Sequence, residues 1–208
     1  MGRRLLAVAW VMLAVGCAGS TPDSAGDTDT QDGTDSDTEE PGGCFADPIS
    51  LIPGTGADSF IPLAGGEEVT IWHGPQGGWH IETAGEAAHT PQNVSILSVV
   101  TAIDQPQQIV IAGAGGATDA ELKGLVAYDD ELCSGTFWGV RAFVDDIEPP
   151  DGSSLQDVIC TLEGQQLEIA ITVAEISTME ATEPPRSATS SVIVTAALDP
   201  VDAADNCH

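Results

Sequence analysis

Positive charge is the property that this sequence has least of. Lysine and arginine together occur 5 times against 33 acidic residues, which gives a formal net charge of −28. Nucleic acid phosphates and anionic membrane surfaces repel so negative a chain. We therefore expect no nucleic acid partner.

The sequence also lacks an apolar run suited to a permanent membrane span. The run from Leu5 to Gly16 is too short, at about 1.5 Å per helical residue, to cross a hydrocarbon core of about 30 Å. It follows Arg3 and Arg4, as in a secretory signal, and leads through small residues directly into Cys17. Residues 1–16 are therefore predicted to be a signal peptide.

The end of this segment, AVGC, resembles the lipobox of bacterial lipoproteins, although Ala14 stands where leucine is preferred. The resemblance implies that Cys17 becomes the first residue of the mature chain and carries fatty acyl chains such as palmitate. At about 0.8 kcal/mol per buried CH₂, several chains make this anchor effectively permanent. The alternative is an ordinary cleaved signal with an incidental cysteine. Ala18 is not the aspartate of inner-membrane retention, so the resemblance implies the outer membrane of a bacterial envelope.

A linker, residues 17–43, is predicted to follow the signal. From Ala18 to Gly43 the chain contains eight acidic residues, no basic residue and no aromatic residue. Such a composition cannot offset the entropy lost on ordering, so we expect a disordered spacer. As a flexible coil it spans roughly 28 Å, and charge repulsion extends it towards a contour length of about 86 Å.

The order of these parts resembles that of uncharacterised envelope lipoproteins of myxobacteria, which combine a lipobox, an acidic Thr/Asp-rich spacer and a β-rich domain. The stretches GTGADSFIPL and GPQGGWH add to this likeness. The resemblance implies an anchored envelope protein, and it implies no activity.

Four cysteines remain beyond the linker, and none of them has the CxxC or Cys/His spacing of a zinc site. An even number in an exported chain predicts two disulfides. Three pairings are possible, and we prefer one of those in which each terminus of the domain is bonded to an interior segment. That pairing is Cys160 with Cys207 and Cys44 with Cys133.

Residues 44–208 are predicted to form one all-β domain. About ten short runs rich in Val, Ile, Thr and Ala alternate with Gly, Pro or acidic residues, and no amphipathic helix of useful length lies among them. This pattern predicts a single immunoglobulin-like β-sandwich, with a β-barrel as the alternative. The runs assigned as strands are SFIPL, EVTIWH, WHIETA, VSILSVVTAI, QQIVIA, LKGLVAY, FWGVRAFV, DVICTL, LEIAITVAE and SVIVTAAL.

Two histidines and two tryptophans flank a glycine-rich loop in the stretch VTIWHGPQGGWHIET. If this stretch is a hairpin closed by residues 74–78, residues whose numbers sum to 152 lie opposite one another. Because side chains alternate along a strand, His73 and His80 then project to opposite faces of the sheet. The predicted core face holds Val69, Ile71, His73, Trp79, Ile81 and Thr83, and the other holds Thr70, Trp72, His80 and Glu82.

The outer face of this hairpin gives the candidate binding residues. Trp72, beside His80 and Glu82, would form a small platform on which a sugar stacks. A zinc or copper site is the alternative, with His73 or His80 joined by His89 from a later loop. The register separates His73 from His80, so no metal site is assigned.

Acidic clusters offer one more candidate site. One cluster is Asp129, Asp130 and Glu131, and the other is Asp145, Asp146 and Glu148. Both lie at predicted loop ends. These carboxylates would bind calcium together if they met in space, and solvated surface charge is the ordinary alternative.

The sequence shows no nucleophile elbow and no dinucleotide-binding βαβ pattern, so we predict no catalytic residue and no cofactor. The leading hypothesis is a non-enzymatic envelope lipoprotein that presents a disulfide-stabilised β-sandwich to another protein or to a polysaccharide. The second is a zinc or copper enzyme built on His73, His80 or His89. The third is an adhesion module tuned by calcium.

Overall fold

The computed structural model of the protein describes residues 45–208, apart from residues 105–107, 177–183, 206 and 208. The predicted signal peptide, the lipidation residue Cys17, the linker and Cys44 lie outside the described residues. Of the described helices, none is long and apolar enough to cross a membrane.

Strands dominate the domain because apolar and polar residues alternate along them. β10 (Gln166–Glu175) is the clearest case, since Leu167, Ile169, Ile171 and Val173 are all fully buried while the residues between them are not. The other strands are β1 (Ser50–Thr55), β2 (Ile61–Pro62), β3 (Glu68–His73), β4 (Trp79–Ala88), β5 (Asn93–Ala102), β6 (Ile109–Ala112), β7 (Glu121–Gly124), β8 (Val126–Asp129), β9 (Ser134–Phe143) and β11 (Ser187–Leu198).

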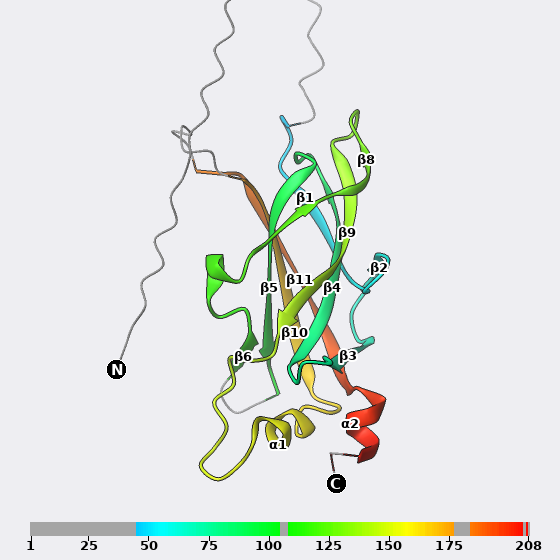
Figure 1. Ribbon diagram of the computed structural model, residues 1–208. Helices are drawn as coiled ribbons and strands as arrows, with labels where there is room; N and C mark the ends of the chain where they lie inside the picture. Colours follow the sequence, from blue (N-terminus) through cyan, green and yellow to red (C-terminus); the bar gives the residue numbers. More distant parts are fainter. Residues whose placement is uncertain (1–44, 105–107, 177–183, 206, 208) are drawn as a thin grey trace, which may run out of the picture. The chain divides into compact units, whose positions relative to one another are not determined.

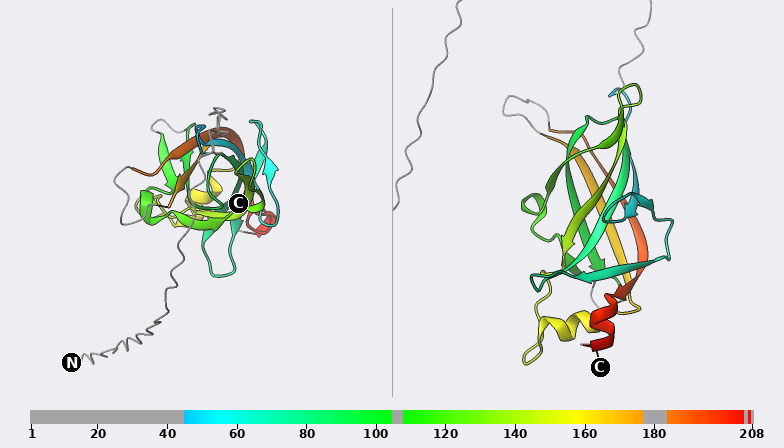
Figure 2. Two further views of the ribbon diagram at one scale, coloured as in Figure 1. Left: turned by 90° about the horizontal axis from the view of Figure 1, so that it is seen from above. Right: turned by 45° about the vertical axis from the view of Figure 1, so that its right-hand side comes forward.

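All of these strands belong to one sheet, which is wrapped round a single core (Figures 1 and 2). One layer contains β5, β10 and β11, and the other contains β9, β4 and the pair β1 and β3, which lie one after the other along the same edge of β4. Between the described strands no ladder joins β9 to β7, so the sheet stays open. The prediction of an all-β, sandwich-like domain is confirmed, with both layers drawn from one continuous sheet.

The predicted register of the β3–β4 hairpin is confirmed. Ile71 lies opposite Ile81, Trp72 opposite His80, and His73 opposite Trp79. Every one of these pairs sums to 152. The predicted core face is buried, apart from the partly exposed His73 at its end.

The segment after β1 covers part of the outer face of β4. β1 and β9 flank β4 on opposite edges, yet the carbonyl of Gly56 accepts a hydrogen bond from the backbone N–H of Gly139 on β9. Gly139 adopts a φ of 64°, and a Cβ there would lie 2.9 Å from the carbonyl oxygen of Ala57. Because the core fills the inner face, the segment crosses the outer one, which explains why Glu82 and Ala84 are buried there.

Two short helices, α1 (Leu155–Cys160) and α2 (Pro200–Asp205), lie at the end of the sheet where the β3–β4 hairpin turns (Figure 1). The prediction that DVICTL is a strand is wrong, because most of it forms α1. Ser154 caps this helix: its hydroxyl accepts from the backbone N–H of Asp157, whose carboxylate accepts from the backbone N–H of Ser154. The bond from the backbone N–H of Ser154 to this carboxylate, together with one from the Ser154 hydroxyl, lowers the pKa of the Asp157 carboxyl.

A disulfide joins the two helical segments, from Cys160 at the end of α1 to Cys207 after α2. This bond is the predicted one. Cys133 is disulfide-bonded as well. Its predicted partner, Cys44, lies outside the described residues, so that pairing stays a prediction.

Candidate functional site

A row of three aromatic rings crosses the outer face of the sheet. Trp72 on β3 lies opposite His80 on β4, and His80 lies opposite Phe143 on β9. The ring centroids of His80 and Phe143 are 6.0 Å apart. Trp72 and Phe143 are 43% and 53% exposed, which is unusual for side chains of their size. The row therefore offers apolar ring faces to solvent.

The next pair on this face of β4 and β9 is charged: Glu82 lies opposite Arg141. Oε1 of Glu82 accepts a hydrogen bond from Nε of Arg141 at 3.2 Å and lies 3.1 Å from Nε2 of His80. Glu82 is only 6% exposed, and its Oε2 has no hydrogen-bond partner within the described part of the chain. Arg141 is exposed over 58% of its side chain. A buried carboxylate thus holds one largely exposed side chain, Arg141, and one largely buried side chain, His80.

This carboxylate also fixes the imidazole of His80. Since a carboxylate only accepts hydrogen bonds, the network assigns the ring hydrogen to Nε2. In this tautomer Nδ1 is an acceptor. It is directed towards the β3–β4 loop, where a Cβ added to Gly74 would lie 3.8 Å from it. His80 can therefore accept a hydrogen bond from a hydroxyl group held beside the loop.

A hollow of about 430 Å³ lies between His80, Phe143, Arg141 and the β3–β4 loop. The loop is closed by a hydrogen bond from the N–H of Gly74 to the carbonyl of Gly78, and Gly77 has a φ of 89° that other residues rarely adopt. The volume of the hollow is in the range of small-ligand sites. It is lined by Gly74, Pro75, Gln76, Gly78, His80, Arg141 and Phe143.

No protein family model matches this chain, and no curated protein matches it in sequence. The geometry of the site is therefore the basis for interpreting function.

The structure brings together the three residues that the sequence suggested for binding, Trp72, His80 and Glu82, and adds two that sequence reasoning missed. Arg141 and Phe143 lie on β9, whose pairing with β4 joins segments about 60 residues apart. The alternation in FWGVRAFV was a usable signal, because it places both residues on one face of a strand. It could not show that this strand lies beside β4.

The three histidines suggested for a metal do not share a site. His73 and His80 project to opposite faces of the hairpin, and His89 follows the far end of β4, about 30 Å from His80 along the strand. Nδ1 of His89 lies 3.9 Å from a carboxylate oxygen of Asp47. Among the residues that the structure describes, no group of three His, Cys, Asp or Glu side chains is arranged to hold a metal ion.

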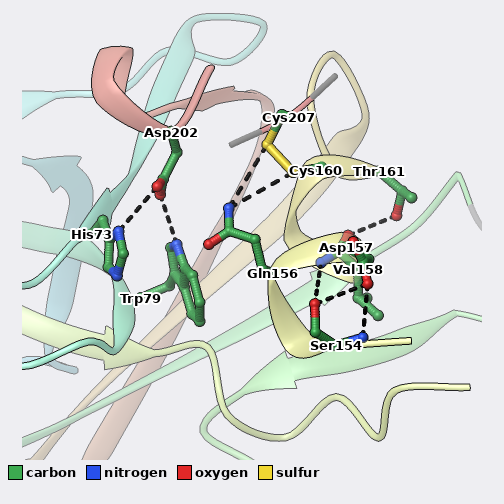
Figure 3. Close-up of a disulfide and its surroundings, with 10 residues drawn as sticks. All are labelled: His73, Trp79, Ser154, Gln156, Asp157, Val158, Cys160, Thr161, Asp202 and Cys207. Carbon is green, nitrogen blue, oxygen red and sulfur yellow. Dashed lines mark hydrogen bonds and ion pairs between the residues drawn. A yellow bond between two sulfur atoms is a disulfide. The ribbon is translucent and has the colours of Figure 1, made fainter. Parts of the chain in front are cut away.

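His73 belongs to a buried cluster that fastens α2 to the sheet (Figure 3). Asp202 is fully buried, and its carboxylate accepts from Nε1 of Trp79 at 2.8 Å and lies 3.0 Å from Nδ1 of His73. The His73 and Trp79 rings stack with centroids 4.6 Å apart. Because these two residues are paired at the base of the β3–β4 loop, α2 supports that loop from the core side.

The two acidic clusters suggested for calcium lie at opposite ends of β9 and do not meet. Asp129 precedes the strand and accepts from the backbone N–H groups of Glu131 and Leu132, as in an ordinary turn. Asp145 follows the strand, about 35 Å away. Its pKa is raised, first by burial and then by the neighbouring charge of Asp146. The condition for a shared calcium site, that the first cluster meets the second in space, is therefore not met by the described carboxylates of Asp129, Asp130, Glu131, Asp145, Asp146 and Glu148.

Proposed function

We propose that this protein is a lipid-anchored lipoprotein of the bacterial outer membrane that binds a saccharide. Cys17 carries the anchor, residues 17–43 hold the domain away from the membrane surface, and the outer face of β3, β4 and β9 binds the ligand. The protein has no catalytic role in this proposal.

The observation that carries the proposal is the pairing of exposed rings with polar groups in and beside one hollow: Phe143, His80 and Arg141 line it, and Trp72 lies opposite His80. Sugars present both C–H faces and hydroxyl groups. The faces of Trp72 and Phe143 are electron-rich and favour contact with C–H groups. Nδ1 of His80 accepts from a hydroxyl, and the guanidinium of Arg141 donates to one. The ring faces and the polar groups lie side by side, on the β3–β4 and β4–β9 strand pairs.

The position of the hollow supports the same proposal. Arg186 donates to the carbonyls of Phe45 and Asp47, where the described chain begins, and to the carbonyl of His89 at the far end of β4. His80 lies at the other end of that strand, about 30 Å away. A domain held by its N-terminal end would therefore present the site away from the anchor.

Replacing Trp72 with alanine is expected to weaken saccharide binding about tenfold or more, since aromatic anchors dominate small interfaces. The measurement is calorimetric titration of the full chain against a panel of soluble neutral and acidic oligosaccharides. Ile193→Ala is the matched control, because Ile193 is a similarly exposed apolar residue on the outer face of β11. Absence of binding by the unaltered chain across the panel would overturn the proposal.

Replacing Cys17 with serine is expected to abolish acylation, because serine lacks the sulfur that accepts the first acyl chains. Cells grown with an alkyne-labelled fatty acid should give a labelled protein that fractionates with the outer membrane, and the Cys17→Ser chain should be unlabelled. Ser20→Ala, three residues further on, should label normally. Equal labelling of the Cys17→Ser chain would remove the anchor from the proposal.

A further inference from the structure

Only three basic side chains occur in the described part of the chain, and they differ in how fully they are bonded. Arg186 makes five hydrogen bonds: Nε and Nη2 donate to Glu175, Nη1 donates to Phe45 and Asp47, and Nη2 also donates to His89. Lys123 pairs with Glu121 at 2.9 Å. Both cations are therefore engaged in holding the fold together.

Arg141 is different because only one of its nitrogens is engaged. Nε donates to Glu82 at 3.2 Å, and the two terminal nitrogens have no partner among the described residues. These nitrogens present four N–H groups in a planar fork, and the side chain is largely exposed beside the hollow that Phe143 and His80 line. Such a fork matches the two oxygens of a carboxylate.

The buried Glu82 binds Nε of Arg141 and leaves the two terminal nitrogens of this fork without a bond to it. Its carboxylate accepts from Nε and is itself closed off from solvent by the segment after β1. This bond restricts the guanidinium, so less side-chain freedom is left to lose when a second carboxylate binds. The net charge of the chain opposes an anion at long range, but salt screens that repulsion beyond about 8 Å at physiological ionic strength.

We propose that the saccharide is acidic: a uronic acid residue places its carboxylate on the terminal nitrogens of Arg141 while its ring lies against Trp72 and Phe143. This inference rests on the proposed saccharide-binding function and adds the ligand class. Asp119, Glu121 and Asp145 line a separate hollow on the other side of Arg141 and Phe143. Their charges disfavour an anion there, so the carboxylate binds on the side of the β3–β4 loop.

The test compares ligands that differ only in this group. The full chain is titrated with oligogalacturonate, oligoglucuronate and oligomannuronate, and with the methyl ester of each. The free acids should bind about tenfold or more tightly than their esters, because hydrogen bonds to charged groups are the stronger class. Their affinity should also fall as salt is added, and that of the esters should not.

Two variants separate recognition from simple damage to the site. Arg141→Gln should reduce binding of the free acids to that of the esters, while Lys123→Gln should leave the ratio unchanged. Asp145→Asn removes a negative charge near Arg141 without touching Glu82, and it should raise affinity for the acids alone.

The outcomes distinguish this inference from the function on which it rests. Equal binding of acids and esters by the unaltered chain would overturn the acidic ligand and leave saccharide binding in place. Binding of neither form of any of the three would overturn the acidic ligand, and binding of neutral sugars elsewhere in the panel would still support the proposed function. An acid-to-ester ratio that survives Arg141→Gln would show that another group recognises the carboxylate, which also contradicts the inference.

Discussion

Replacing Cys160 and Cys207 together with alanine is expected to lower the free energy of unfolding by about 4 kcal/mol. The disulfide closes a loop with a sequence separation of 47, and in the chain-entropy model such a loop restricts the unfolded chain by about that amount. Denaturant unfolding of the variant and of the unaltered chain measures the difference, with both slopes compared to check that the unfolded states remain alike.

The single variants provide the control for this prediction. Cys160→Ala and Cys207→Ala each remove the same covalent bond, so each should be destabilised about as much as the double variant. A double variant within about 1 kcal/mol of the unaltered chain would mean that native contacts already hold the C-terminal segment. In that case the bond from the N–H of Cys207 to the carbonyl of Asp202 would be among the contacts responsible.

Replacing Asp202 with alanine is expected to cost about 3 kcal/mol. The change removes the acceptor for Nε1 of Trp79 and the partner of His73, both of which lie against the fully buried carboxylate. A buried donor left without a partner costs about 1–3 kcal/mol, and hydrogen bonds to a charged group are worth about 1.5–3 kcal/mol, with some overlap between the two effects. Thermal or denaturant unfolding of the full chain measures the loss.

Asp199→Ala is the matched control, since Asp199 is another acid of the same C-terminal segment. Its carboxylate accepts from the backbone N–H of Val201 and lies 3.4 Å from the N–H of His73. It acts as a helix cap and should cost only about 1 kcal/mol. Equal losses from the two variants would show that the buried cluster is no more important than the cap.

The β3–β4 hairpin shows how much of the site local sequence could predict. Loop length and alternation were enough to place Trp72, His80 and Glu82 on one face, and the structure has that register. Both signals act between neighbours in the sequence, so nothing distant was needed. The preferred Cys160–Cys207 pairing is also confirmed, and it bonds the C-terminal end of the domain to an interior segment, as the sequence argument expected.

The sequence-based predictions failed where distant contacts or helix capping decide the structure. Arg141 and Phe143 join the site through the β4–β9 ladder, which no local pattern specifies. β1 was not predicted because Pro53 and Gly54 in SLIPGT resemble turn residues. DVICTL has the apolar residues of a strand, but the capping box that starts with Ser154 makes its first part a helix.

The five hydrogen bonds of Arg186 decide how the domain would resist force. In a chain whose predicted Cys44–Cys133 bond has been reduced, tension applied ahead of Phe45 reaches the guanidinium bonds to Phe45 and Asp47 before it reaches the first pair of the β1–β4 ladder, Ser50 and Ala88. His80 and α2 lie at the opposite end of the sheet (Figure 1), so a pull between the two ends would run along the strands and shear this ladder. The side chain of Arg186 would therefore bear load before β1 does.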